Sequence, residues 1–251
     1  MRRLARRVTG TTGLDHLARM VPVADLVHEL GTGTLLDAGS GSQGIRPLLD
    51  AGWDVTAVDA SFEDYGAAAG PDEGLTAVVG DVRALPFENA VFDVVIAVDL
   101  LEHLAPDDRE QAIAELARVA RRRVIVACPA GPAALEADRR LADALSTPPP
   151  WLAEHLANGF PDAAEVHDRL APHGIANSAG NEYVRSHERL VSAELTPLWF
   201  VPSRLAALAL RWAFRRGGSP RRWARSTLLR LRGGDRAPTY RAIVWVDLVS
   251  S

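Results

Sequence analysis

The sequence contains no lysine and only one cysteine, Cys128, and these scarcities exclude several kinds of protein. A lone cysteine rules out an internal disulfide and a cysteine metal cluster. Cys128 lies in an apolar stretch, so we interpret it as a small buried hydrophobe. This cysteine usage is typical of a reducing compartment, and we therefore expect a cytoplasmic protein.

Long hydrophobic runs are also missing. No stretch reaches the ~18 uncharged apolar residues that span a bilayer. No apolar segment follows the arginine-rich residues 1–7, as a secretory signal would require. With 251 residues, 47% hydrophobic and 24% charged, the chain has the size and composition of one large α/β domain.

The charge is unevenly distributed. The formal net charge is −4, but Arg204 to Arg241 holds eleven arginines and one acid, a local charge of +10. The remainder carries 17 arginines against 31 acids, or −14. Tryptophan and leucine interleave with these arginines, as in helices at an anionic membrane surface. The second interpretation of this segment is a packed helical cap, and nucleic acid is its least favoured partner.

Residues 35–44 read Leu-Leu-Asp-Ala-Gly-Ser-Gly-Ser-Gln-Gly and organise the rest of the chain. Thr34 to Leu36 has the pattern of a short strand, and the glycines that follow favour a tight turn. Ile45, Leu48 and Leu49 then recur at helical spacing. We predict a strand, a glycine turn and a helix, the arrangement that binds nucleotides at the carboxyl edge of an open α/β sheet.

Two kinds of cofactor suit this turn. Gly39, Gly41 and Gly44 satisfy G-x-G-x-x-G, and Asp59 follows at the spacing of a ribose-binding acid, as in NAD-dependent proteins. However, Asp37 stands two residues before the first glycine, where its charge would repel a pyrophosphate and attract a cationic cofactor. The turn therefore resembles motif I of the class I S-adenosylmethionine-dependent methyltransferases.

Further strands and helices are predicted along the chain. A helical region at 14–30 is interrupted by Pro22, and a second helix spans 112–120. Apolar or alternating runs predict strands at 53–59, 75–79, 91–98, 124–127, 182–186 and 240–249.

The stretch from Gly80 to Leu104 adds four motifs in a fixed order. They are an acid at Asp81, then Leu85-Pro86-Phe87, Phe92-Asp93 and Leu101-Glu102-His103. This order resembles the type 11 branch of class I methyltransferases over residues 30–130. Gln43 stands where that family usually has a third glycine, with Gly44 one residue later.

The resemblance implies an α/β, Rossmann-like fold with a seven-stranded, mainly parallel sheet, an antiparallel last strand and helical insertions. Residues 1–251 would form one methyltransferase domain. Its cofactor-binding core would occupy about 30–130, a helical cap about 131–180 and a basic helical insertion about 188–238.

The resemblance also implies S-adenosyl-L-methionine as the cofactor. Asp59, at the end of the second strand, would bind the ribose hydroxyls. Asp81 and Val82 would contact the adenine, and Asp99 would lie beside the methionine part of the cofactor. The predicted cofactor-binding residues are Asp37, Gly39, Ser40, Gly41, Asp59, Ala60, Asp81, Val82, Asp99 and Leu100.

Methyl transfer needs alignment of acceptor and methyl group, and a base only where the acceptor must lose a proton. His103 and His155 are the candidate bases, although each could instead be structural. No metal ligands are identified. The motif of enzymes that methylate base amines is absent. We expect methyl transfer to oxygen of a small-molecule, glycan or lipid-linked acceptor, at the inner face of the membrane in the last case. A non-catalytic cofactor-binding or membrane-associated accessory protein is the alternative.

Overall fold

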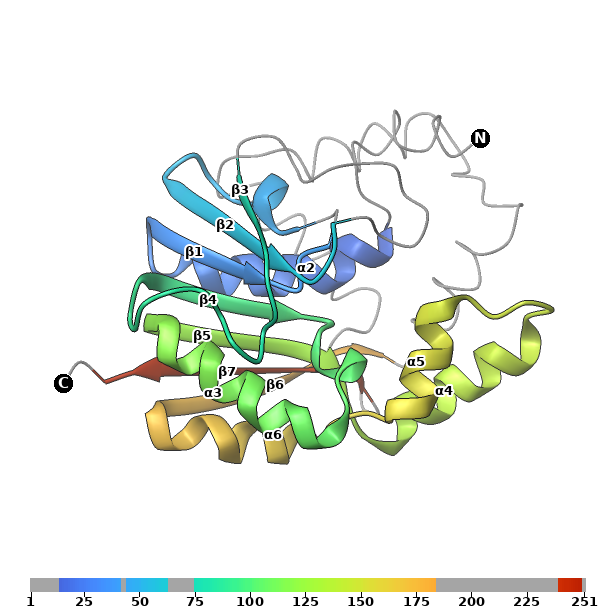
Figure 1. Ribbon diagram of the computed structural model, residues 1–251. Coiled ribbons are helices and arrows are strands. Elements are labelled where there is room, and N and C mark those ends of the chain that lie inside the picture. Colours follow the sequence, from blue (N-terminus) through green and yellow to red (C-terminus); the bar gives the residue numbers. More distant parts are fainter. Residues whose placement is uncertain (1–13, 42–43, 63–74, 184–238, 250–251) are drawn as a thin grey trace.

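The computed structural model describes residues 14–41, 44–62, 75–183 and 239–249. These residues form a seven-stranded sheet in the order β3-β2-β1-β4-β5-β7-β6 (Figure 1). The strands are β1 Gly33–Ala38, β2 Trp53–Asp59, β3 Thr76–Val79, β4 Phe92–Val98, β5 Ala120–Pro129, β6 Gly174–Tyr183 and β7 Thr239–Leu248.

The sheet is parallel from β3 to β5, and β7 runs antiparallel to both β5 and β6. This confirms the predicted fold, with the antiparallel last strand between β5 and β6. Because all parallel strands end at one edge, the residues that follow β1, β2, β3 and β4 gather there.

Helices cover both faces of the sheet (Figure 1). The helices are α2 Leu14–His28, α3 Arg109–Val119, α4 Gly131–Ala144, α5 Pro150–Asn158 and α6 Ala163–Leu170. On β4, Val95 packs into the core that contains α3 and α6, while Val94 and Ile96 pack into the core that contains α2. Burial on both faces explains why this strand is an unbroken apolar run.

Two local predictions are wrong. Pro22 does not interrupt the first helix but lies inside α2. Val21, Val23 and Ala24 are fully buried there, and this packing outweighs the hydrogen bond that proline removes. After the glycine turn the chain forms only the 3-10 turn η1, Arg46–Leu48, because Pro47 opens a new turn rather than extending one.

The strand predicted at 182–186 is also misplaced. The structure has β6 at Gly174–Tyr183, and residues 184–186 lie outside the described part of the chain. Alternation is weak in β6, which contains Gly174, Asn177 and Gly180, so its side chains gave little strand signal. Helices α4, α5 and α6 occupy the region predicted as a helical cap, but β6 begins within it.

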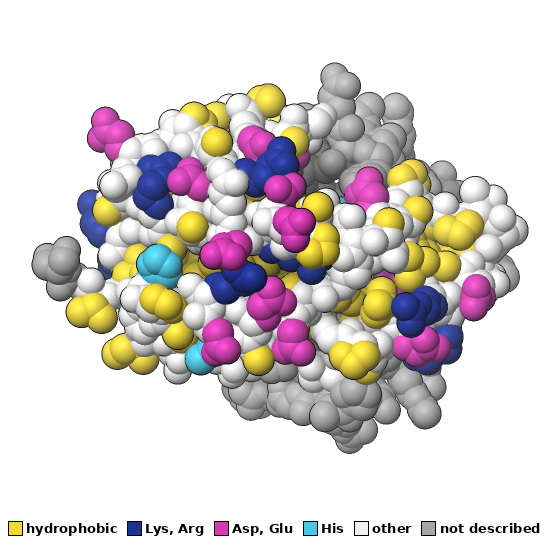
Figure 2. Space-filling view, turned by 60° about the horizontal axis from the view of Figure 1, so that its bottom comes forward, with side chains coloured by type: hydrophobic (Ala, Val, Ile, Leu, Met, Phe, Trp, Pro, Cys, Tyr) yellow, Lys and Arg dark blue, Asp and Glu magenta, His cyan; other side chains and the backbone are white. Residues whose placement is uncertain are grey.

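Helices α4 and α5 lie beyond the carboxyl ends of the parallel strands (Figure 1). In a view of the face with α3 and α6, acidic and basic side chains are interspersed, and hydrophobic side chains gather over α4 and α5 (Figure 2). Among the described residues, no helix has the length and apolar content to cross a bilayer. The predicted basic insertion at 188–238 lies outside the described residues.

Candidate active site

The glycine turn brings the ends of β1 and β4 together. Gly39 has φ +72°, and a Cβ there would lie 2.8 Å from Cδ1 of Leu100, so only glycine allows this approach. Asp37 is 2% exposed, and its Oδ2 accepts the backbone N–H of Ile45 at 2.8 Å. A Cβ at Gly44 would lie 2.7 Å from the same oxygen. Gly44 thus lets the backbone close over Asp37.

Asp59 at the end of β2 holds the turn from the other side. Its Oδ2 accepts the N–H of Gly41 at 2.8 Å, and its Oδ1 accepts the N–H of Ser61 at 3.0 Å. A carboxylate has about four acceptor positions, so two remain for a pair of ribose hydroxyls. Ala60 is exposed beside this carboxylate, and Ser40 is nearly buried within the turn.

Asp81 and Val82 follow β3. Hydrogen bonding to Arg83 lowers the pKa of Asp81, and Arg83 also reaches Asp108 at 2.8 Å. Asp81 thus stays ionised, but a guanidinium already occupies one side of it. Val82 is 8% exposed and belongs to the core formed with α3. The Arg83 contact depends on the turn between these residues and was not predicted from the sequence.

Asp99 follows β4 with φ +52°, an uncommon value for a residue with a side chain. Its carboxylate accepts hydrogen bonds from Arg19 of α2 at 2.7 Å and from Nε of Arg241 of β7 at 2.7 Å. Burial alone would raise the pKa of Asp99, but the charges of Arg241 and Arg19 lower it well below its usual value. Arg241 is 3% exposed and lies in the interior. Its inclusion in the predicted surface-binding segment is therefore wrong.

The two candidate bases lie side by side. The rings of His103, in the 3-10 turn η2 (Leu101–His103), and His155, in α5, have centroids 5.1 Å apart. Nδ1 of His103 lies 2.7 Å from Oε2 of Glu154, and Nδ1 of His155 lies 2.7 Å from Oδ2 of Asp138. In each pair the carboxylate favours a proton on Nδ1, which leaves Nε2 as the atom with a lone pair.

Arg109 joins the two elements that carry these histidines. This 5%-exposed side chain donates to the backbone oxygen of Leu101 in η2 at 3.0 Å. It also donates to the oxygens of Asn158 at 3.1 Å and Gly159 at 2.6 Å, at the end of α5. The side-chain amide of Asn158 donates to the backbone oxygen of Glu102 at 3.2 Å. These bonds fix η2 against α5, which holds the imidazoles together.

The environment of His155 is aromatic and dry. Its ring packs against Trp151 and Phe160, with centroids 5.1 and 5.2 Å away. Burial lowers the pKa of His155, although Asp138 opposes the shift, so the imidazole is held neutral. The hydroxyl of Tyr240 donates to Oδ1 of Asp138 at 2.9 Å, which orients the carboxylate that orients the histidine.

Both histidines were predicted from the sequence, but the groups that position them were not. Asp138, Glu154, Arg109 and Tyr240 carry no motif. Glu154 precedes His155, so a helix points the two side chains in different directions. The only signal available was the polar Asp138 on the apolar face of α4, where Ala134, Ala137 and Leu141 are buried.

Comparison with known proteins matches residues 36–128 to a family model described as a methyltransferase domain, the type 11 model. The matched segment contains the glycine turn, the strand-end acids and His103. Residues 36–128 of this chain form a methyltransferase domain of this family. The expected enzyme class and cofactor are thereby confirmed.

Solved structures share the fold of this methyltransferase. The PH0226 protein of Pyrococcus horikoshii OT3 is 22% identical, with a TM-score of 0.51 over 71% of this chain and 91% of its own. A protein of Anabaena variabilis, described as a possible methyltransferase of an antibiotic biosynthesis pathway, is 15% identical, with a TM-score of 0.55 over 92% of this chain and 100% of its own. At these identities the likeness concerns architecture alone.

The strand-end residues of this methyltransferase fit S-adenosylmethionine. The Asp59 carboxylate retains acceptor positions for ribose hydroxyls, and Gly39 and Gly41 have the positive φ angles that form the tight turn beside it. Asp37 and Asp99 supply negative charge near the turn, which suits a sulfonium and an ammonium group. The individual cofactor contacts stay predictions.

Proposed function

We propose that this methyltransferase transfers a methyl group to a hydroxyl oxygen of a small-molecule, glycan or lipid-linked acceptor. The observation that carries this proposal is the pair of imidazoles at the end of β4, with Nδ1 of each bonded to a carboxylate. This arrangement prepares two Nε2 atoms to accept a proton. A carboxylate acceptor would not need it.

When bound, S-adenosylmethionine supplies an electrophilic methyl group and leaves as a neutral thioether after methyl transfer. The chain's own residues must position the acceptor hydroxyl and receive its proton. His103 is 26% exposed at its side chain and His155 only 7%, so His103 is the more accessible to an acceptor. The ring of His155 lies 5.1 Å from it, centroid to centroid, and is buried beside Trp151 and Phe160.

The first prediction concerns proton removal. His103→Gln should lower kcat by about 10²-fold or more, because glutamine cannot take the proton, while cofactor affinity stays nearly unchanged. His155→Gln should also lower kcat. The measurement requires an acceptor, which can be found by incubating labelled S-adenosylmethionine with cell extract and identifying the labelled product by mass.

The matched control is His173→Gln, which changes an exposed histidine in the 3-10 turn Ala171–His173. It should leave kcat unchanged. A full rate in His103→Gln, with the protein folded and the product methylated on oxygen, would contradict the catalytic assignment. A product methylated on nitrogen or carbon would contradict the proposed acceptor.

A further inference from the structure

Glu102 is the most unusual polar residue of the described chain. Its side chain is completely buried, and neither carboxylate oxygen has a hydrogen-bond partner. The nearby cations Arg19 and Arg241 are both bonded to Asp99. Burial and the charge of Asp99 raise the pKa of Glu102 well above its usual value. A buried carboxyl without partners is costly, which calls for a group that would bind it.

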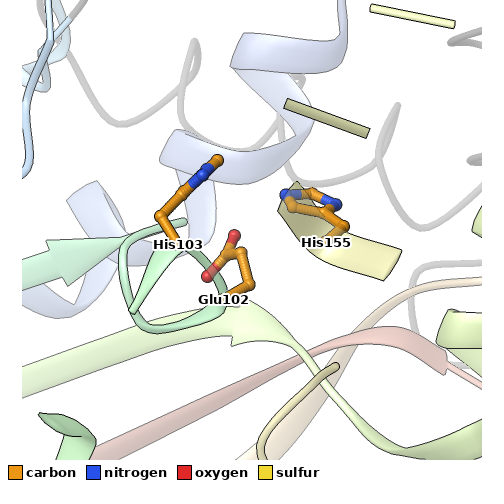
Figure 3. A group of neighbouring side chains, drawn as sticks. All are labelled: Glu102, His103 and His155. Carbon is orange, nitrogen blue, oxygen red and sulfur yellow. The ribbon is translucent and has the colours of Figure 1, made fainter. Parts of the chain in front are cut away.

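Two imidazoles meet this carboxyl. Ligand atoms of Glu102, His103 and His155 all lie within 4.8 Å of one another. Figure 3 shows the Glu102 carboxylate pointing between the two rings, with Glu102 and His103 from η2 and His155 from α5. Two adjacent residues of a turn and one residue of a helix 52 positions later therefore converge.

The second layer of contacts has the form found around metal-binding histidines. Such histidines donate one ring N–H to a carboxylate and bind the metal through the other nitrogen. Here Glu154 and Asp138 each hold an Nδ1 at 2.7 Å. Tyr240 in turn holds Asp138. This layer leaves both Nε2 atoms for a common ligand.

We propose that Glu102, His103 and His155 bind a divalent transition-metal ion through one carboxylate and two Nε2 atoms. Two imidazoles and one carboxylate suit Zn²⁺, Co²⁺, Fe²⁺ or Mn²⁺ better than Ca²⁺ or Mg²⁺, which prefer all-oxygen sites. Metal–ligand bonds of about 2.1 Å would place the ligand atoms about 3.4 Å from one another. Side-chain rotations that move each ligand atom by about 1 Å would therefore complete the site.

Three protein ligands leave at least one coordination position for another oxygen. For catalysis the inference rests on the proposed function. An acceptor hydroxyl in that position would lose its proton to water more readily, because the cation stabilises the alkoxide. The histidines would then act as ligands and the cation would take over the activation of the hydroxyl. Metal binding itself does not depend on the acceptor.

The test measures metal binding directly. Untagged full-length protein, stripped with a chelator, is titrated with Co²⁺ and followed by visible absorption, and with Zn²⁺ by calorimetry. We expect one ion per chain and a ligand-field spectrum with nitrogen and oxygen ligands. Glu102→Gln and His155→Gln should each weaken binding at least about 10²-fold, and Asp138→Asn about 10- to 100-fold.

Glu102→Gln is a near-isosteric change at a carboxyl without partners, and its fold is checked by circular dichroism. Asp138→Asn leaves all three ligands in place, so weaker binding in this variant reports orientation of His155. The control His173→Gln should bind normally. The proposal would be overturned if the parent protein bound no ion at a ratio of one per chain, or if Glu102→Gln bound the ion as tightly as the parent protein does.

A chelator separates this inference from the proposed function. Loss of oxygen methylation on chelation, restored by Zn²⁺, Mn²⁺ or Co²⁺, supports the catalytic role of the ion. Full activity of the stripped enzyme overturns that role and returns the histidines to proton transfer. An enzyme that binds one ion but methylates another kind of atom supports the metal site and contradicts the proposed function.

Discussion

Asp59 offers the most direct test of cofactor binding at a single residue. Asp59→Ala should weaken S-adenosylmethionine binding by roughly 1–3 kcal/mol, measured by calorimetry. The substitution removes the charged acceptor for the ribose and also frees the N–H of Gly41, so both losses act in the same direction.

The matched control lies on the same strand. Asp54 is exposed near the start of β2, and Asp54→Ala should leave cofactor affinity unchanged. Equal affinities in Asp59→Ala and the parent protein would contradict the ribose assignment. Tight binding of NAD, with none of S-adenosylmethionine, would contradict the cofactor itself.

Residues at or next to the carboxyl ends of strands were predictable, because parallel strands all end at one edge of the sheet. Asp37, Asp59 and Asp99 follow from that rule. The contacts of Glu102 were not predictable. Glu102 belongs to a recognised motif, but its burial and its approach to His155 depend on where α5 docks, and helix docking leaves no trace in a local pattern.

At the scale of elements, Asp99 links three of them. Its carboxylate, directly after β4, binds Arg19 of α2 and Arg241 of β7, and Arg241 is almost fully buried. Replacing one member of a buried ionic cluster leaves the remaining charges buried without an opposite charge beside them. This site therefore contributes to stability only while Asp99 is ionised.

Asp99→Asn should lower the free energy of unfolding by about 3 kcal/mol at pH 7. The pKa of Asp99 is lowered in the folded protein, so its contribution is complete above the unfolded value of about 3.9 and is lost as the pH falls through the folded value. The difference between parent and variant, measured by urea unfolding, should thus begin to shrink below about pH 5 and continue to shrink below about pH 3.

The exposed acid Asp107 provides the control, since Asp107→Asn should show no such trend. Parallel pH profiles for Asp99→Asn and the parent protein would show that the ionised carboxylate does not stabilise the fold.

Elements with strong periodicity were predicted well, and weak ones were not. The central strand β4 is a β-branched run buried on both faces, and α3 buries Ala112, Ile113 and Leu116 at helical spacing. β6 instead contains two glycines and four polar residues besides its terminal Tyr183. Hydrogen-bonded pairing with β7 stabilises this segment as a strand, and the local sequence does not indicate which strand it pairs with.

At the scale of the whole molecule, the charge asymmetry supports a proposal about membranes. We propose that the basic segment binds an anionic lipid surface, which would bring the enzyme to a lipid-linked acceptor. Arg241 is buried, and the other ten arginines lie outside the described residues. Each arginine near such a surface contributes about 1 kcal/mol, so three or four suffice for useful affinity.

The full chain should co-sediment with vesicles rich in phosphatidylglycerol, and raised salt should weaken this binding. Replacement of Arg211, Arg215, Arg221 and Arg222 by Gln should abolish it. The adjacent pair Arg139 and Arg140, exposed on α4, is the control for the pair Arg221 and Arg222. No co-sedimentation of folded protein at low salt would contradict the proposal.

The position of β7 has a consequence for the order in which the newly synthesised chain can complete its site. A ribosome delivers β1 to β5, α4 and α5 well before it delivers Tyr240 and Arg241. Asp138 gains the Tyr240 hydroxyl, 102 positions later, only then, and Asp99 gains Arg241, 142 positions later. A nascent chain can thus form most of its sheet while the orientation of His155 is unfinished.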